Sequence, residues 1–116
     1  MLVIDLERAK VTLNETWDEM LGSWTKTLLK YMYGKDVKVV ANLNENDDSP
    51  EFIIRGKYKD VKAYAQAIAA EKEFLDAYQE YGTDHPQTER KRHELRNEVS
   101  NFEQVTGLIW PFKDED

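Results

Sequence analysis

The 116-residue sequence contains no cysteine. Disulfide bonds, zinc or iron–sulfur centres held by cysteine and a thiol nucleophile are therefore excluded, and the composition suits a reducing compartment. Glycine is also scarce, with five residues at scattered positions. They form none of the glycine-rich patterns that cradle phosphates, so nucleotide binding through such a loop is not expected.

Long apolar runs are absent as well. No segment approaches the roughly 20 consecutive apolar residues that a membrane-spanning helix requires. Acidic side chains occur as early as Asp5 and Glu7, which interrupts the apolar core that a signal peptide would need. We therefore expect a soluble protein of the cytoplasm that does not associate with membranes.

The charge balance is acidic. A net charge of -7 gives a field that repels phosphate backbones, so direct binding to nucleic acid is not expected. The hydrophobic fraction of 41% is that of a globular protein, and the length is that of one ordinary domain. The sequence predicts a single domain over residues 1–116.

The first predicted element is a long helix. From Leu6 to Tyr31 apolar residues recur at steps of three and four, with Asp5 as a candidate cap and Gly34 as a stop. Thr12 with Glu15 reads as a capping box. That alternative gives a later helix start and leaves residues 2–11 partly extended, but we favour the longer helix.

A β-hairpin is predicted next, from strands over residues 37–43 and 52–58. Residues 44–51 between them are polar and acidic and are expected to form a flexible loop. Because an isolated hairpin is marginal in water and leaves two open edges, it must pack on helices or gain another strand. That strand could come from residues 2–4, from residues 108–110 or from another chain.

Two further helices complete the predicted α+β, mainly helical fold of order α-β-β-α-α. One runs from about Asp60 to the stop at Gly82, with these apolar residues on one side: Val61, Tyr64, Ala65, Ile68, Leu75 and Tyr78. The other starts at His85-Pro86 and ends at Gly107, where Leu108 can contact the helix end. Its predicted face holds Thr88, Arg92, Leu95, Val99, Phe102 and Val105. An apolar anchor of Ile109, Trp110 and Phe112 precedes an acidic tail over residues 113–116.

The first helix carries a heavy apolar face that includes Trp17, Met20, Trp24 and Tyr31. Such residues dominate both cores and interface hot spots. A helix of about 28 residues would span roughly 42 Å, more than a domain of this size readily covers. We therefore expect this face to form core, interpret part of it as a protein interface, and predict a homodimer.

Residues with catalytic or metal-binding chemistry are sparse. His85 and His93 stand eight positions apart, too far for a helical metal pair, and no serine has a nucleophile context. We predict no enzyme activity and no cofactor or metal. The one basic cluster, Arg90, Lys91, Arg92 and Arg96, is interleaved with glutamates and indicates a salt-bridge network or a contact for an acidic partner.

The favoured function is therefore that of a small accessory protein that binds another protein or itself. The alternative is an acidic protein that imitates nucleic acid and blocks a nucleic-acid-binding protein, of the kind that some phages encode. Residues 59–116 carry 8 basic and 13 acidic residues against 8 and 10 in residues 1–58, a modest asymmetry in the direction that such a mimic needs.

Overall fold

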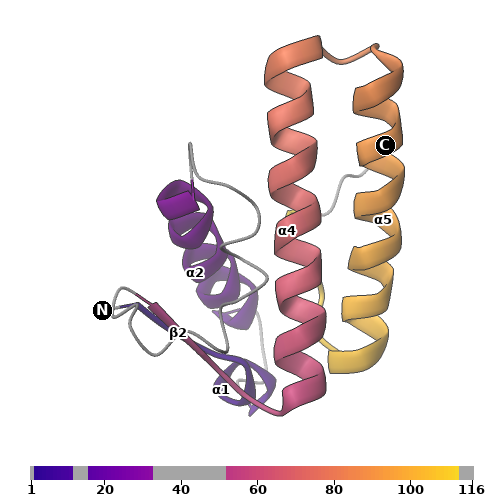
Figure 1. Cartoon of the computed structure of the whole chain (residues 1–116). Helices are drawn as coiled ribbons and strands as arrows, with labels where there is room; N and C mark the ends of the chain where they lie inside the picture. Colours follow the sequence, from indigo (N-terminus) through magenta and orange to yellow (C-terminus); the bar gives the residue numbers. More distant parts are fainter. Residues whose placement is uncertain (1, 12–15, 33–51, 113–116) are drawn as a thin grey trace.

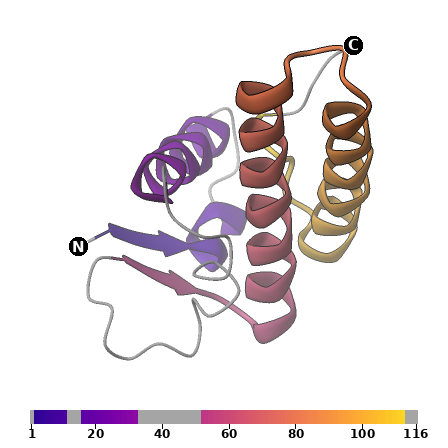
Figure 2. The same cartoon turned by 45° about the horizontal axis from the view of Figure 1, so that its top comes forward.

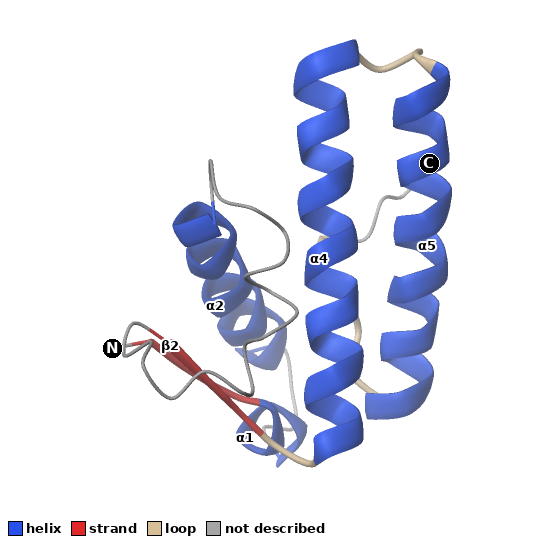
Figure 3. Cartoon of the chain, in the orientation of Figure 1, coloured by secondary structure: helices blue, strands red, loops and turns tan. Residues whose placement is uncertain are grey.

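The computed structural model of the chain describes residues 2–11, 16–32 and 52–112 (Figure 1). In chain order it contains β1 (Leu2–Asp5), α1 (Leu6–Val11), α2 (Thr16–Met32), β2 (Phe52–Arg55), α4 (Tyr58–Tyr81) and α5 (Pro86–Thr106). The long helices α4 and α5 lie antiparallel, and α1, α2 and the two strands pack on the other side of α4 (Figures 1 and 2). The predicted class, α+β and mainly helical, is confirmed (Figure 3).

The N-terminal part departs from the single long helix that we favoured. The chain begins with the strand β1, and the helical residues that follow belong to two helices, α1 and α2. Asp5 does cap a helix, since its Oδ1 accepts a hydrogen bond from the backbone N of Arg8 at 3.1 Å. The predicted start of the first helix at Leu6 therefore agrees with the structure. The described helical residues form two helices, and residues 12–15 between them lie outside the described residues.

The described sheet is a parallel pair and not a hairpin. β1 and β2 run parallel, with Leu2 opposite Phe52 and Asp5 opposite Arg55. The extra strand considered for residues 2–4 is thus confirmed, whereas the predicted strand at 37–43 and the loop at 44–51 lie outside the described residues. β2 is shorter than predicted because Gly56, at φ +149°, turns the chain into α4, which already includes Tyr58.

The helices α4 and α5 form a helical hairpin, and three of its boundaries agree with the sequence: the end of α4, the start of α5 and the end of α5. α4 ends at Tyr81 before Gly82, and α5 begins at Pro86. The His85 ring caps α5, because its Nδ1 accepts a hydrogen bond from the backbone N of Gln87 at 3.0 Å. Gly107 ends α5 in the left-handed conformation, at φ +78°.

The core lies where α4 meets both neighbouring layers. Buried side chains of β1, α1 and α2 face α4, and they include Ile4, Leu6, Ala9, Leu21 and Leu28. Tyr64 of α4 is completely buried, and its hydroxyl forms a 2.8 Å hydrogen bond with Thr25 Oγ1 of α2. Burial raises the pKa of the Tyr64 phenol, so the group stays protonated and neutral in the core.

A partly buried ion pair joins α1 to the start of α4. Lys10 Nζ donates to the carboxylate Oδ2 of Asp60, a residue with no exposed surface. The hydrogen bond to Asp60 raises the pKa of Lys10, so the ammonium form is favoured. The other carboxylate oxygen of Asp60, Oδ1, makes no hydrogen bond with any residue that the structure describes. Among the described residues, Lys10 is thus the cation that pairs with this buried carboxylate.

Candidate functional site

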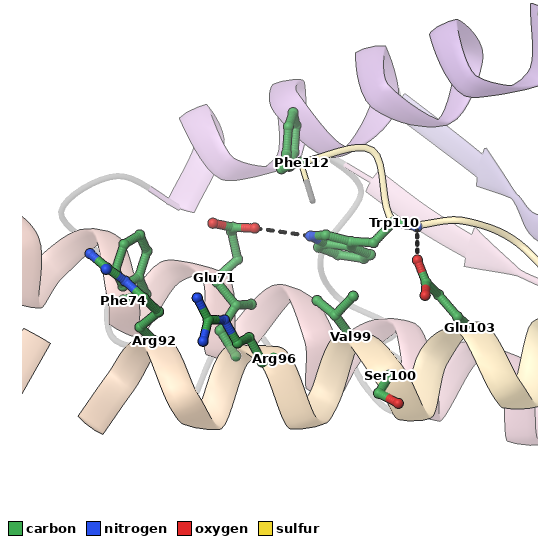
Figure 4. Close-up of a pocket in the computed structure, with 10 residues that line it drawn as sticks. Glu71, Phe74, Arg92, Arg96, Val99, Ser100, Glu103, Trp110 and Phe112 are labelled. Carbon is green, nitrogen blue, oxygen red and sulfur yellow. Dashed lines mark hydrogen bonds between the residues drawn. The ribbon is translucent and has the colours of Figure 1, made fainter. Parts of the chain in front are cut away.

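A cavity of about 540 Å³ lies between α4, α5 and the segment that follows α5. We call it the C-terminal cavity (Figure 4). Its walls are mostly apolar, with charged groups at several points. The described residues that line it are Glu71, Phe74, Arg92, Leu95, Arg96, Val99, Ser100, Glu103, Trp110 and Phe112.

The segment after α5 is positioned by local hydrogen bonds and by burial. After Gly107 the backbone N of Leu108 donates to Thr106 Oγ1 at 3.0 Å, and the Leu108 side chain is buried. This brings Trp110, which is only 1% exposed, onto the rings of Phe102 and Tyr64 at centroid distances of 5.2 and 5.8 Å. The predicted apolar anchor is confirmed for Trp110, whereas Ile109 is 51% exposed.

Two glutamates hold Trp110 in place. Its indole Nε1 donates to Glu71 Oε1 at 2.9 Å, and its backbone N donates to Glu103 Oε2 at the same distance. Glu71 is only 6% exposed, and burial raises the pKa of its carboxyl, an effect that the indole hydrogen bond partly opposes. The cavity therefore contains a buried acid whose charge is disfavoured.

Arg92 and Arg96 of α5 lie on the same side of the cavity, one helical turn apart (Figure 4). The Arg92 guanidinium lies over the Phe74 ring at 5.3 Å from its centroid and pairs through Nη1 with Glu89 at 3.1 Å. Its Nε is buried and has no acceptor in the described part of the chain. Arg96 is exposed. The cavity thus has a cationic side and an apolar interior.

A second surface lies where α4 passes α2. Leu75 and Tyr78 are 41% and 48% exposed, and with Leu29 of α2 they line a groove of about 310 Å³. We call this the α2–α4 groove. Tyr64 and Ile68, predicted on the same side of this helix, are fully buried, whereas Leu75 and Tyr78 are exposed further along it.

The aromatic face predicted as an interface is described only in part. Trp24 packs, partly buried, against the core, and Met20 is half-buried. The side chains of Trp17 and Tyr31 lie outside the described residues. The interface role of these four residues stays a prediction, and the described contacts of Trp24 are those of a core residue.

The basic cluster of α5 forms the predicted ion pairs with its own helix. Lys91 contacts Glu94 at 3.5 Å and also Glu73 of α4 at 2.7 Å, while Arg92 pairs with Glu89 as described above. Arg90 donates to the side chain of Gln87. Several carboxylates of α4 and α5 are therefore already paired with cations. A nucleic-acid mimic would present unpaired carboxylates, so these ion pairs give no support to that proposal.

The two histidines have different surroundings. The His85 ring, which caps α5, is stacked on Tyr81 with centroids 4.4 Å apart, and His93 is exposed. Within the described ranges, no group of three or more His, Asp or Glu side chains is arranged to hold a metal ion.

Glu71 was missed as a site residue although the sequence contains a signal for it. It follows Tyr64 and Ile68 at helical spacing, on the face predicted to be buried. A lone carboxylate on such a face requires a hydrogen-bond donor nearby. The donor, Trp110, lies 39 positions further along the chain, so the pair could not be derived from local spacing.

Replacing Glu71 by glutamine is expected to change how stability depends on pH. Because the folded protein raises this pKa from its ordinary value near 4.5, the folded state binds the proton more tightly. Wild-type stability therefore falls as pH rises through this region. Glu71→Gln cannot titrate at this position and has no such loss. The free energy of unfolding of the variant minus that of wild type should therefore increase by on the order of 1 kcal/mol from about pH 4 to about pH 7.

Urea unfolding at several pH values measures this difference. The matched control is Glu80→Gln, on the exposed side of the same helix, which reports the effect of removing one surface charge. A relative stability of Glu71→Gln that is constant with pH would contradict the raised pKa.

No family model, curated protein or solved structure matches this chain. Among the helices that the structure describes, none combines the length and the apolar character needed to cross a membrane. The proposals below therefore depend on the geometry of the described residues.

Proposed function

We propose that this protein is a small accessory module that works by protein binding and associates with a second copy of itself through the α2–α4 groove. The observation that carries the proposal is the exposure of Leu75 and Tyr78, at 41% and 48%, beside Leu29. Large apolar side chains grouped at a groove are typical of interaction sites. The groove also extends the predicted interface, since one of its walls belongs to α2.

The rim of the groove favours a second copy as the partner. Lys72 and Asp76 line it and form an ion pair at 2.7 Å. Both signs of charge therefore surround the same apolar centre. In a two-fold contact each surface meets its own copy, so a rim of mixed sign can be self-complementary.

Light scattering over a wide concentration range tests this proposal. Because each chain carries a net charge of -7, salt should screen the repulsion between copies and strengthen an apolar dimer. We expect the measured mass to rise toward twice 13.6 kDa with concentration, and at lower concentration when salt is added.

Replacing both Leu75 and Tyr78 by glutamate should abolish the dimer, because charge is then buried in the interface. The matched control adds the same charge at Asn97 and Asn101, two exposed residues of α5, and should still dimerise. A wild-type protein that remains monomeric at every concentration and salt level would refute self-association.

A further inference from the structure

The C-terminal cavity has the dimensions and the lining of a small-molecule site. Its volume of about 540 Å³ lies within the roughly 300–1,000 Å³ of typical ligand pockets. Five apolar side chains from three parts of the chain line it: Phe74, Leu95, Val99, Trp110 and Phe112. Such walls select a ligand with an apolar body.

The polar groups of the cavity indicate which head group this ligand carries. The two carboxylates among the described lining residues already accept hydrogen bonds from Trp110: Glu71 from the indole and Glu103 from the backbone. The buried Nε of Arg92 has no acceptor among the described residues. The polar side-chain atom of the lining residues that has no partner in the described part of the chain is therefore a donor, which favours a ligand that brings a hydrogen-bond acceptor.

Charge points to the same chemistry. Arg96 lies one turn along α5 from Arg92, lines the same cavity and is exposed to an incoming ligand. A guanidinium binds a carboxylate through parallel, charge-assisted hydrogen bonds. Figure 4 shows both arginines on the side of Phe74, with Val99 and Trp110 further along the cavity.

We propose that the C-terminal cavity binds a small organic carboxylate with an apolar chain. The carboxylate contacts Arg92 and Arg96, and the chain lies along Val99, Trp110 and Phe112. This site is separate from the α2–α4 groove, so ligand binding and self-association can be measured independently.

Titration with decanoate, followed by NMR, tests the proposal on the full chain. The indole N–H of Trp110 is assigned by its absence in Trp110→Phe, and it reports on the cavity because it donates to Glu71. We expect decanoate to shift this signal saturably. The neutral 1-decanol and the cationic decylammonium, with the same chain length, should bind about tenfold or more weakly because neither brings a carboxylate for the charge-assisted pair with a guanidinium.

The decisive variant is Arg96→Gln, because an exposed side chain can be replaced without disturbing the core. It should weaken decanoate binding by about tenfold and leave the weak binding of 1-decanol unchanged. The matched control is Arg90→Gln, which removes a guanidinium from the same helix but outside the cavity, and it should bind decanoate as wild type does. Equal affinity for decanoate and 1-decanol, no saturable shift, or unchanged affinity in Arg96→Gln would each overturn the proposal.

Discussion

Replacing Trp110 by alanine should lower the free energy of unfolding by about 3–5 kcal/mol, the usual cost of deleting a large buried aromatic side chain. The ring is 1% exposed and contacts the rings of Tyr64, Phe102 and Phe112. Its removal opens a void at the junction of α4, α5 and the C-terminal segment. It also leaves the buried Glu71 carboxyl without its indole donor.

Urea unfolding followed by circular dichroism measures this loss. The matched control is Ile109→Ala at the adjacent position, where the side chain is 51% exposed, and its effect should stay within about 0.5 kcal/mol. Trp110→Phe should fall between the two, because it restores most of the ring volume but not the hydrogen bond to Glu71. A stability of Trp110→Ala close to that of wild type would show that the C-terminal segment does not pack on α4 and α5 in solution.

Replacing Lys10 by methionine should cost about 3–5 kcal/mol, because removal of one partner leaves a buried charge without compensation. Asp60 has no exposed surface, and its second carboxylate oxygen has no partner among the described residues. Methionine preserves the apolar length of the lysine side chain. The loss therefore reports the charge of Lys10 and little of its packing.

Lys91→Met is a closely matched control. The side chains of Lys10 and Lys91 are 25% and 26% exposed, and each pairs with a carboxylate of α4. The partner of Lys91, Glu73, is 36% exposed, whereas the side chain of Asp60 is fully buried. Lys91→Met should therefore cost only about 0–1 kcal/mol. Equal losses in the two variants, measured by urea unfolding, would contradict the role given to the burial of Asp60.

The helical hairpin could be predicted from the sequence because its ends are determined by neighbouring residues. Gly82 and Gly107 stop the two helices, and His85 with Pro86 starts the second one. Each signal acts within a few positions and needs no knowledge of the rest of the fold. The ion pairs of Arg92 and Lys91 with Glu89 and Glu94 follow from helical spacing in the same way.

The sheet and the sites could not be predicted so directly, because they depend on distant contacts. Residues 2–4 were one of several possible partners for β2, and spacing alone cannot choose among them. Periodicity assigned Leu75 and Tyr78 to the same face as Tyr64, but it does not show where the covering layer ends. The C-terminal cavity likewise exists only because Trp110 folds back onto Glu71, 39 positions earlier.

The parallel sheet also has a consequence for the entropy of folding. Leu2 pairs with Phe52, so the sheet closes a loop of about fifty residues, at an entropic cost of roughly 3.5 kcal/mol from the length-dependent part alone. Lys10 and Asp60 are separated by the same 50 positions. Once the strands are paired, the lysine and the aspartate are already near each other, and their contact requires almost no further loop closure. The sheet and the ion pair thus share a single entropic cost, which makes the ordering of the N-terminal segment a cooperative event.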